Sequence, residues 1–409
     1  MNKPNSINAQ RLNRRLEELS QIGRRPDGGV CRLAFSDADL LGRNYVASAL
    51  SELGLEVRID AVGNLFGILK GTSDQKAVMC GSHTDTVATG GRYDGALGVL
   101  AALECIERMV EEGFSPAQSV VIASFVNEEG VRFMPDMMGS LYHSGSLTLE
   151  DVLGATDKDG VSIGAELNRL SYSGQDALND LDITAFVELH IEQGPVLEDA
   201  HIPIGIVSGV QGLSWQEVTV SGKSNHAGTT PMDRRLDAGV VANQLIHGIH
   251  ALPLAMDGLR LTIGSVTYHP SLINVIPNKV TFTIDLRHPN PTQLEQAERL
   301  VQAILQAPQP CRVTSKPLAR VDPCSFAPNV VEAAQKAAKS AGYPFTTMIS
   351  GAGHDAQILQ SCYPSGMIFI PSKDGVSHDV SEYSSPHDIA AGANVLLGAL
   401  LELSEGSLR

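Results

Sequence analysis

The strongest constraint on the fold of this chain is a glycine-rich segment, residues 80–98, that lies between two apolar runs. The run before it, residues 77–80, is typical of the end of a short buried strand. The run after it, residues 96–110, is apolar throughout and lacks proline, which indicates a mostly buried helix. The segment itself carries one histidine and two acids. Because open α/β sheets bind ligands at the carboxyl ends of their strands, we expect a metal or catalytic site here.

The same pattern of a buried strand followed by ionisable residues recurs later in the chain. A second strand, residues 119–126, follows the helix and runs directly into Glu128 and Glu129. Strand, helix and strand predict a βαβ unit whose two acidic loops lie at the same edge of the sheet. A third strand, residues 183–190, ends in His190. These strands predict an α/β domain with its chemistry at one sheet edge.

The middle of the chain has a different order of elements, strand–helix–strand–strand–helix–strand, which is that of a ferredoxin-like unit. Its expected elements are residues 215–220, 232–250, 259–268, 279–286, 291–306 and 311–315. On either side we expect strands and helices at residues 7–22, 55–60, 64–69, 328–341, 345–349, 367–370 and 388–403. The chain therefore divides into a domain of residues 1–210 plus 326–409 and an inserted α+β domain, residues 211–325.

Length and composition limit the class of protein. A chain of 409 residues is too long for one ordinary core, and 43% hydrophobic residues with 19% charged residues are typical of a globular protein. The net charge of −16 argues against a nucleic-acid or anionic-membrane partner. No apolar run approaches the ~20 residues that span a bilayer. The six cysteines are scattered without a CxxC motif, so we expect reduced, mostly buried thiols and a cytoplasmic protein.

Six ionisable residues end buried strands or lie in glycine-rich loops: His83, Asp94, Glu128, Glu129, His190 and His378. Three imidazoles and three carboxylates suit two divalent ions that share one carboxylate. This ligand set fits Zn²⁺, Mn²⁺, Co²⁺ or Ni²⁺. A further acid is available to accept a proton from a bound water. Asp85 is placed to accept the second imidazole N–H of His83 and so to orient it.

Each residue also has an ordinary structural explanation. A histidine at a strand end is more often structural than a ligand. Asp94 is placed to cap the following helix, and Glu128 with Glu129 would make a solvated loop pair. Arg287, on the polar face of its alternating strand, would be a solvated strand-end arginine. We expect no function for His143, His201, His247, His250, His269, His288 and His387, and only a supporting role for His354 and Asp355.

Six motifs, in the same order and spread over nearly the whole chain, resemble those of the M20 metallopeptidase-like amidohydrolases. They resemble most the branch that holds N-carbamoyl-L-amino-acid hydrolases, allantoate amidohydrolases and β-ureidopropionases. The motifs are GSHTD at 81–85, YDG at 93–95, NEEG at 127–130, ELHIEQG at 188–194, NHAGTTPM at 225–232 and GAGHD at 351–355. The resemblance implies a mixed-sheet, zinc-peptidase-like catalytic domain with an inserted lid and dimerisation domain.

The resemblance also implies roles for individual residues. His83 and His190 would hold one divalent ion, Glu129 and His378 the second, and Asp94 would bridge them. Glu128 would be the general base that activates the water. His226 would reach the partner subunit's site and polarise the ureido carbonyl of the substrate, and Asn274 would support the same carbonyl oxygen. Arg287 would bind the substrate carboxylate, and Gln193 and Gly353 would line the pocket.

These roles imply an N-carbamoyl-L-amino-acid hydrolase that acts as a homodimer on a small molecule with a carboxylate and a ureido group. Residues 91–95 and 125–133 resemble that group most. Residues 210–215 contain no Arg or Lys, which weighs mildly against an allantoate amidohydrolase, the second choice. A β-ureidopropionase or a true peptidase comes third. The alternative from a different class of protein is a non-catalytic binding protein on the same scaffold. Such a protein is expected to lack one of the metal ligands or the general base.

Overall fold

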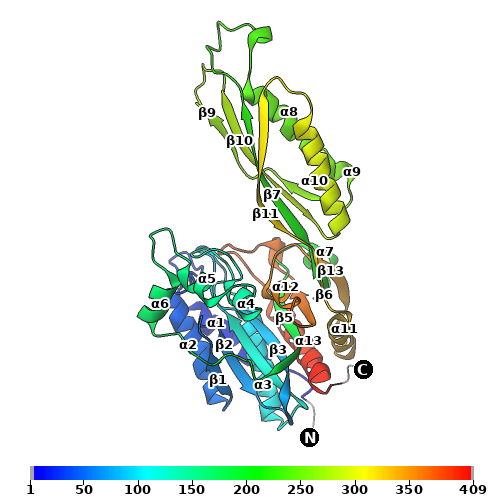
Figure 1. The fold of residues 1–409 in the computed structure, drawn as a ribbon. Helices are drawn as coiled ribbons and strands as arrows, with labels where there is room; N and C mark the ends of the chain where they lie inside the picture. Colours follow the sequence, from blue (N-terminus) through cyan, green and yellow to red (C-terminus); the bar gives the residue numbers. More distant parts are fainter. Residues whose placement is uncertain (1–3, 407–409) are drawn as a thin grey trace. The chain divides into compact units, whose positions relative to one another are not determined.

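The computed structural model describes residues 4–406, which form two compact units (Figure 1). The first unit is interrupted after Ser208 and resumes at Ser325. The second unit, Gly209–Cys324, is a continuous insertion between these two points.

The first unit is built on a nine-stranded mixed sheet in the order β1-β2-β4-β3-β5-β14-β6-β12, with β13 paired to β6. The strands are β1 (Glu56–Ile59), β2 (Leu65–Leu69), β3 (Ser73–His83), β4 (Gln118–Phe125), β5 (Asp182–Ile191), β6 (Ile204–Val210), β12 (Cys324–Ser325), β13 (Phe345–Ser350) and β14 (Ser365–Ile370). The four central strands, β4, β3, β5 and β14, run parallel, and β2 and β6 flank them antiparallel. The predicted βαβ unit is confirmed, and its two loops lie at one sheet edge.

The central strands are buried on both faces, because helices cover both sides of the sheet. Val46 and Leu50 belong to one large apolar core, which joins alternate strand residues, such as Val78 and Cys80, mainly to four helices. These are α1 (Ala9–Ser20), α3 (Ala96–Glu111), α11 (Pro328–Ser340) and α13 (Pro386–Ser404). The remaining helices of this unit are α2 (Asp37–Glu52), α4 (Met138–His143), α5 (Leu149–Gly154), α6 (Ile163–Leu170), α7 (Val196–Ala200) and α12 (Asp355–Leu359).

Helix α2 was not predicted from the sequence, although it is regular and capped by Ser36, whose side chain accepts from the Asp39 N–H. Its buried face carries Asp39 and Arg43, which form an ion pair of 3.0 Å between Oδ2 and Nη2. Buried charges reverse the apolar pattern by which amphipathic helices are recognised. The short helices α4, α5 and α6 were missed as well.

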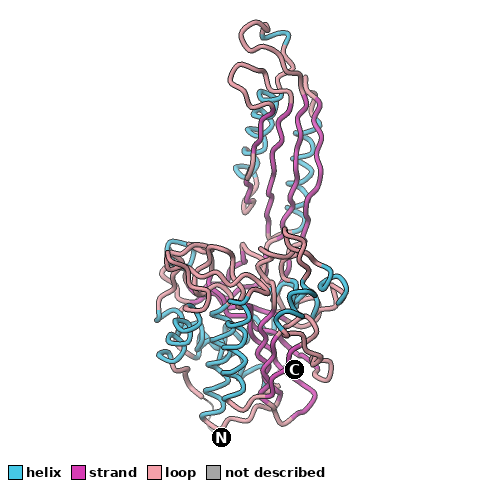
Figure 2. Tube along the Cα trace, turned by 90° about the vertical axis from the view of Figure 1, so that its left-hand side faces the viewer, coloured by secondary structure: helices cyan, strands magenta, loops and turns pink. Residues whose placement is uncertain are grey.

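The second unit has the predicted strand–helix–strand–strand–helix–strand order. Its elements are β7 (Gly212–Ser221), α8 (Ala238–His250), α9 (Leu252–Ala255), β8 (Arg260–Thr262), β9 (Val266–His269), β10 (Lys279–His288), α10 (Pro291–Gln306) and β11 (Arg312–Val321). The sheet order is β11-β7-β10-β8, with β9 also on β10, and all neighbours are antiparallel. Helices α8 and α10 share one core with the inward side chains of β7 and β10. Figure 2 shows the helices and strands of both units by colour.

Two predicted elements of this unit had wrong bounds. The strand expected over residues 259–268 is interrupted between β8 and β9, where the Ser265 N–H donates to the Thr283 side chain. The helix expected from residue 232 begins only at Ala238, because Asp237 caps it by accepting from the next N–H groups. Before it lies a single 3₁₀ turn, Met232–Arg234.

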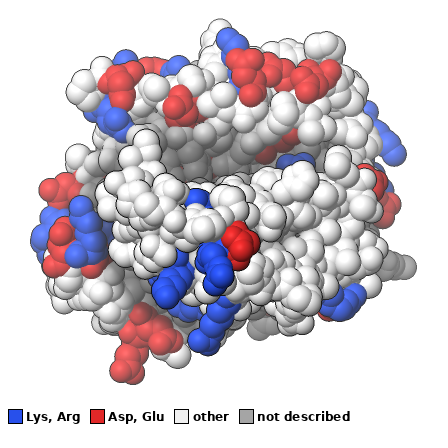
Figure 3. Space-filling view, turned by 90° about the horizontal axis from the view of Figure 1, so that it is seen from above, with Lys and Arg blue, Asp and Glu red and all other residues white. Residues whose placement is uncertain are grey.

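The cysteines are free: Cys80, Cys105 and Cys311 are buried, Cys31 and Cys324 half-buried, and Cys362 exposed. No helix within residues 4–406 combines the length and the apolar character needed to cross a bilayer. On the face shown in Figure 3, acidic and basic side chains lie in small separate groups among uncharged areas.

We predict that Gly81→Ala strongly destabilises the first unit. Gly81 has a φ of +144°, and a Cβ there would lie 1.9 Å from the Ala123 carbonyl oxygen of β4. Backbone strain and overpacking together should lower the free energy of unfolding by about 3 kcal/mol or more. Denaturant unfolding would measure the change. Gly154→Ala, where no atom lies within 4 Å of the new Cβ, is the matched control and should be neutral or slightly stabilising. Equal stability of both variants would contradict this account.

Candidate metal centre

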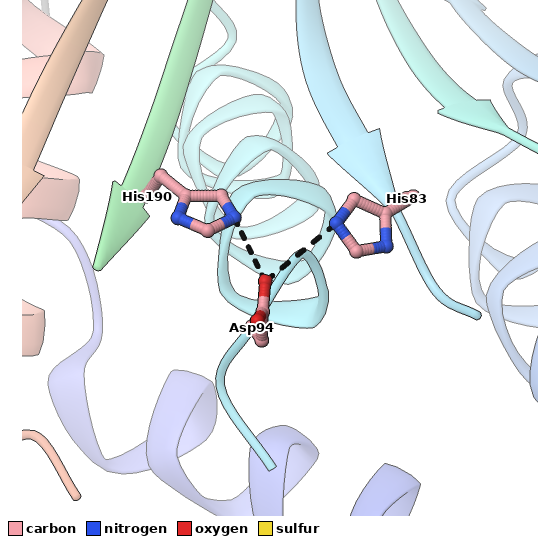
Figure 4. Close-up of side chains that lie close together, drawn as sticks. All are labelled: His83, Asp94 and His190. Atoms are coloured by element: carbon pink, nitrogen blue, oxygen red, sulfur yellow. Dashed lines mark ion pairs between the residues drawn. The ribbon is translucent and has the colours of Figure 1, made fainter. Parts of the chain in front are cut away.

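Two buried histidines face one aspartate at the carboxyl ends of adjacent parallel strands (Figure 4). His83 is the last residue of β3, and His190 lies one residue before the end of β5. The Nε2 atoms of His83 and His190 lie 3.7 and 3.1 Å from Oδ1 of Asp94, which belongs to the loop between β3 and α3. Because β3 and β5 are parallel neighbours, their carboxyl ends, and with them both imidazole rings, lie at the same edge of the sheet.

The other oxygen of Asp94 faces a different group. Its Oδ2 lies 3.2 Å from Nε2 of His378, which in turn lies 3.4 Å from Oε2 of Glu129. The structure therefore contains two ligand groups that share one carboxylate: His83, Asp94 and His190, and Asp94, Glu129 and His378. A carboxylate whose two oxygens face different imidazoles is suited to bridge two cations.

Two of the ordinary structural explanations for these residues are wrong. Asp94 does not cap α3, because the N-cap position is Gly95 and α3 has no side-chain cap. Glu128 is buried and Glu129 is half-buried, so they are not a solvated loop pair. Oε2 of Glu128 lies 3.4 Å from Nε2 of His83, and Oε1 of Glu129 accepts from the Val87 N–H.

Asp85 orients its neighbours differently from the expectation. The Nδ1 of His83 is 3.0 Å from the backbone carbonyl of Asp85, whereas the nearer carboxylate oxygen of Asp85 is 3.7 Å away. The carboxylate instead accepts from the backbone N–H groups of Glu128 and Glu129, each at 3.3 Å. Asp85 therefore fixes the ring of His83 through its backbone and the acidic loop through its side chain.

Burial and charge set the protonation of the cluster. Burial lowers the pKa of His83 to about 4, so its ring is neutral. Burial also lowers the pKa of His190, but its hydrogen bond to Asp94 outweighs this and raises the value to about 9. Burial raises the pKa of Asp94, yet its bonds with His190 and His378 hold that pKa well below the usual range. The protonated ring of His190 therefore neutralises Asp94.

The remaining carboxyl groups lack such compensation. Burial, and then the neighbouring carboxylates, raise the pKa of Glu128 and Glu129 well above the ordinary value. Burial raises the pKa of Asp85 to about 6 and that of Glu382 to about 7. A buried set of acids with imidazoles on both sides fits divalent cations, because cations would stabilise the ionised carboxylates that burial disfavours.

Three residues of the site have left-handed backbones, which non-glycine residues rarely adopt. Asn127, Gln193 and His378 have φ values of +51°, +57° and +59°. Such conformations cluster where function requires a particular geometry. The Gln193 side chain donates to Oδ2 of Asp94 at 2.9 Å and to Ser377 Oγ at 3.1 Å, so it contacts the cluster directly.

Sequence reasoning missed three buried or half-buried partners of these residues. Glu382 accepts from the N–H groups of Tyr93 and Asp94, and Ser377 contacts both Asp94 and Glu382. Glu188 accepts from Ser82 Oγ at 2.7 Å. Of these three, only Glu188 has a signal in the sequence: it lies two residues before His190, and so on the same face of the strand.

His354 and Asp355 are both buried, which fits the supporting role expected for them. The His354 Nε2 lies 3.0 Å from Ser350 Oγ, and its ring centroid lies 4.6 Å from that of His190. Gly353 lies before them, exposed in the loop between β13 and α12 and beside the Met137 side chain.

In the second unit, His226 and Asn274 are neighbours. The Ala227 N–H donates to the Asn274 carbonyl, and both Gly228 and Thr229 donate their N–H groups to Nδ1 of His226. Because Nδ1 accepts, the neutral ring carries its proton on Nε2. The exposed His226 side chain therefore presents a hydrogen-bond donor.

Arg287 lies at the opposite end of the same sheet. The pairing of β7 with β10 places Lys279 at one end, beside the loop that leads to His226, and Arg287 at the other. These two positions are eight residues apart on one strand, or about 26 Å. The Arg287 guanidinium is held by Asp285, whose two oxygens both lie 3.1 Å from Nε. The alternating burial predicted for β10 is confirmed.

Comparison with known proteins agrees with the fold and identifies the family. The model of peptidase family M20/M25/M40 matches residues 79–402. The N-carbamoyl-L-amino acid amidohydrolase of Geobacillus stearothermophilus is 38% identical over 408 residues, 98% of this chain and 100% of that protein. The allantoate amidohydrolase of Bacillus subtilis (strain 168) is 38% identical over 400 residues, 95% of this chain and 96% of that protein.

A crystal structure of a hydantoinase/carbamoylase family amidase from Burkholderia multivorans superimposes with a TM-score of 0.94 at 38% identity, covering 98% of this chain and 99% of that chain. Residues 79–402, which the family model matches, include every residue of the two ligand groups. The protein is therefore a member of peptidase family M20/M25/M40, in its hydantoinase/carbamoylase branch, and a hydrolase of the carbamoylase and amidohydrolase type.

Proposed function

We propose that the protein hydrolyses the ureido C–N bond of N-carbamoyl-L-amino acids to the L-amino acid, carbon dioxide and ammonia. The observation that carries the proposal is the Asp94 carboxylate, whose Oδ1 faces His83 and His190 and whose Oδ2 faces His378. Such a bridge is a device for hydrolysis by two cations. The relative from Geobacillus stearothermophilus, an N-carbamoyl-L-amino acid amidohydrolase, supports this substrate class.

The ligands in this proposal are His83 and His190 for one divalent ion, Glu129 and His378 for the other, and Asp94 for both. Zn²⁺, Mn²⁺, Co²⁺ or Ni²⁺ suits the mixture of imidazole and carboxylate. Bound there, the two ions would activate a water molecule and polarise the carbonyl of the substrate's ureido group.

Glu128 is the proposed general base. Its carboxylate is not in either ligand group, and it lies 3.4 Å from His83, beside the cluster. A carboxylate beside the ligand groups is placed to accept a proton from a water molecule bound there. Glu128 would take the proton of the attacking water and return it to the leaving nitrogen. Asp85 keeps Glu128 in place by accepting its backbone N–H.

Five further residues are proposed to bind the substrate. Arg287 would bind the carboxylate as a bidentate partner, while Nε2 of His226 and the side chain of Asn274 would stabilise the developing oxyanion. Gln193 and Gly353 would line the pocket. Because Arg287 and His226 lie at opposite ends of one sheet, a small substrate cannot touch both in the same chain.

We therefore propose a homodimer in which His226 and Asn274 serve the partner's site. Exposed apolar side chains surround the His226 end of the unit: Leu236 is 43%, Leu272 59% and Ile273 104% exposed. A partner subunit would cover them.

A second candidate is allantoate hydrolysis, favoured by the equal identity of the Bacillus subtilis allantoate amidohydrolase. Both substrates carry a carboxylate and a ureido group. A β-ureidopropionase is a third candidate.

A substrate panel tests the proposed activity. Ammonia release would be measured for the metal-loaded enzyme with N-carbamoyl-L-methionine, allantoate and N-carbamoyl-β-alanine. We expect the highest kcat/KM with N-carbamoyl-L-methionine. A higher value with allantoate would replace the first candidate by the second.

Glu128→Gln tests the base. Loss of a general base should lower kcat about 10²- to 10⁴-fold, while the metal content measured by mass spectrometry stays that of the parent. The exposed Glu112→Gln, at the opposite end of α3 from Asp94, is the control and should keep full activity. Unchanged turnover of Glu128→Gln with its metals retained would remove Glu128 as the base.

Mixed dimers test the role of His226 across subunits. His226→Ala and Glu128→Gln should each be nearly inactive alone, yet mixing their subunits should recover up to roughly a quarter of the parent activity. Half of randomly paired dimers are mixed, and each has one intact site. Activity would be assayed after unfolding and refolding the two variants together, with native mass spectrometry to count mixed dimers. Mixed dimers without activity, or a fully active monomer, would contradict the proposal.

A further inference from the structure

We propose that Glu382 is a positioning residue that holds Asp94 in its bridging orientation and joins the loop of Asp94 to the loop of His378. The inference rests on the proposed role of Asp94 as a bridging ligand. Neither the sequence patterns nor the two ligand groups include Glu382.

The first observation is the contact between Glu382 and the backbone of the Asp94 loop. Oε1 of Glu382 accepts from the N–H of Tyr93 at 2.9 Å and from the N–H of Asp94 at 3.2 Å. The side chain is buried, with 4% exposure. These N–H groups precede α3, which has no side-chain cap of its own, so the carboxylate also lies near the positive end of that helix.

The second observation is a hydrogen-bond link from Glu382 to the carboxylate of Asp94. Ser377 Oγ lies 3.1 Å from Oε2 of Glu382 and 3.2 Å from Oδ2 of Asp94. Gln193 donates both to Ser377 Oγ and to Oδ2 of Asp94. A hydroxyl has one proton and two lone pairs, so Ser377 accepts from Gln193 and donates to one of the two carboxylates. This network fixes Oδ2 and leaves Oδ1 facing His83 and His190.

The third observation is the close packing of Glu382 on Gly91. A Cβ at position 91 would lie 2.3 Å from Oε1 and 2.5 Å from Cβ of Glu382. Both the end and the base of the side chain are therefore in the way, so no rotation of the carboxylate alone would make room. Gly91 permits the contact between the two loops.

Glu382 is suited to orient a metal ligand and is not itself placed as one. Its Oε1 already accepts two backbone N–H groups, and its Oε2 lies 3.1 Å from the Ser377 hydroxyl. Because Glu382 lies four residues after His378, the same carboxylate restrains ligands of both groups. Partners that orient metal ligands typically change metal affinity 10- to 100-fold when removed.

The test is a chelator competition with cobalt-loaded protein, which measures Co²⁺ affinity without using activity. The variants are Glu382→Ala, Glu382→Gln and Gly91→Ala, with Gly154→Ala as the control because no atom lies within 4 Å of its new Cβ. We expect Glu382→Ala and Gly91→Ala to bind Co²⁺ about 10- to 100-fold more weakly than the parent. Gly154→Ala should match the parent.

Glu382→Gln separates positioning from charge. Its amide oxygen can accept both backbone N–H groups, and its NH₂ can donate to Ser377, which then donates to Asp94. We expect this variant to restore Co²⁺ affinity to within about threefold of the parent, as geometric positioning requires. A purely structural role would instead lower thermal stability in Glu382→Ala with Co²⁺ affinity equal to the parent's, which would overturn the inference.

The outcomes distinguish the inference from the proposed function. A parent protein that binds fewer than two Co²⁺ per chain would refute the two-metal function itself, whatever Glu382 does. A parent with two Co²⁺ and variants of equal affinity would refute only the role of Glu382. If Glu382→Ala does not fold, Gly91→Ala decides by the same measurement, since it leaves every ionisable side chain in place.

Discussion

The structure depends on one constraint: several carboxylates are removed from water at a place where imidazoles are their main counter-charges. Asp94 is stabilised by His190 and His378, whereas burial and mutual repulsion raise the pKa of Glu128 and Glu129. Buried like charges this close are favourable only when cations or protons neutralise them. The demand for positive charge is therefore a property of the folded chain, and it is what suits this sheet edge to bind cations.

The fold meets this demand with backbone groups instead of basic side chains. Asp85 accepts the N–H groups of Glu128 and Glu129, and Glu382 accepts those of Tyr93 and Asp94. In both cases one buried carboxylate takes two successive N–H groups and so fixes a loop that carries ligands. A lysine or arginine placed against Asp85 or Glu382 would also stabilise the carboxylate, but its charge would oppose binding of a cation nearby. Peptide dipoles orient the ligands without that opposition.

The second unit separates two kinds of substrate contact along one strand. Arg287 lies near the points where the chain enters and leaves the unit, while His226 and Asn274 lie at the far end of the sheet, with exposed apolar residues around them. A rigid strand of this length keeps the two groups apart. Association of two copies is the arrangement we propose to unite them in one site, and the hydrogen bonds to Nδ1 of His226 leave its Nε2 proton for the substrate.

The sequence by itself determined the local structure and the types of chemistry. Apolar strands that end in His83, Glu128 and His190 predicted the parallel strands and their common edge, because strand direction and a period of two leave little freedom. It did not predict α2, whose buried face carries Asp39 and Arg43, nor the break between β8 and β9. Only the tertiary structure decided which oxygen of Asp94 faces which histidine, and that Glu382, almost three hundred residues later, supports the same loop. Contacts between distant loops leave no periodic signal in a chain, since they depend on how the packed elements bring separate turns together.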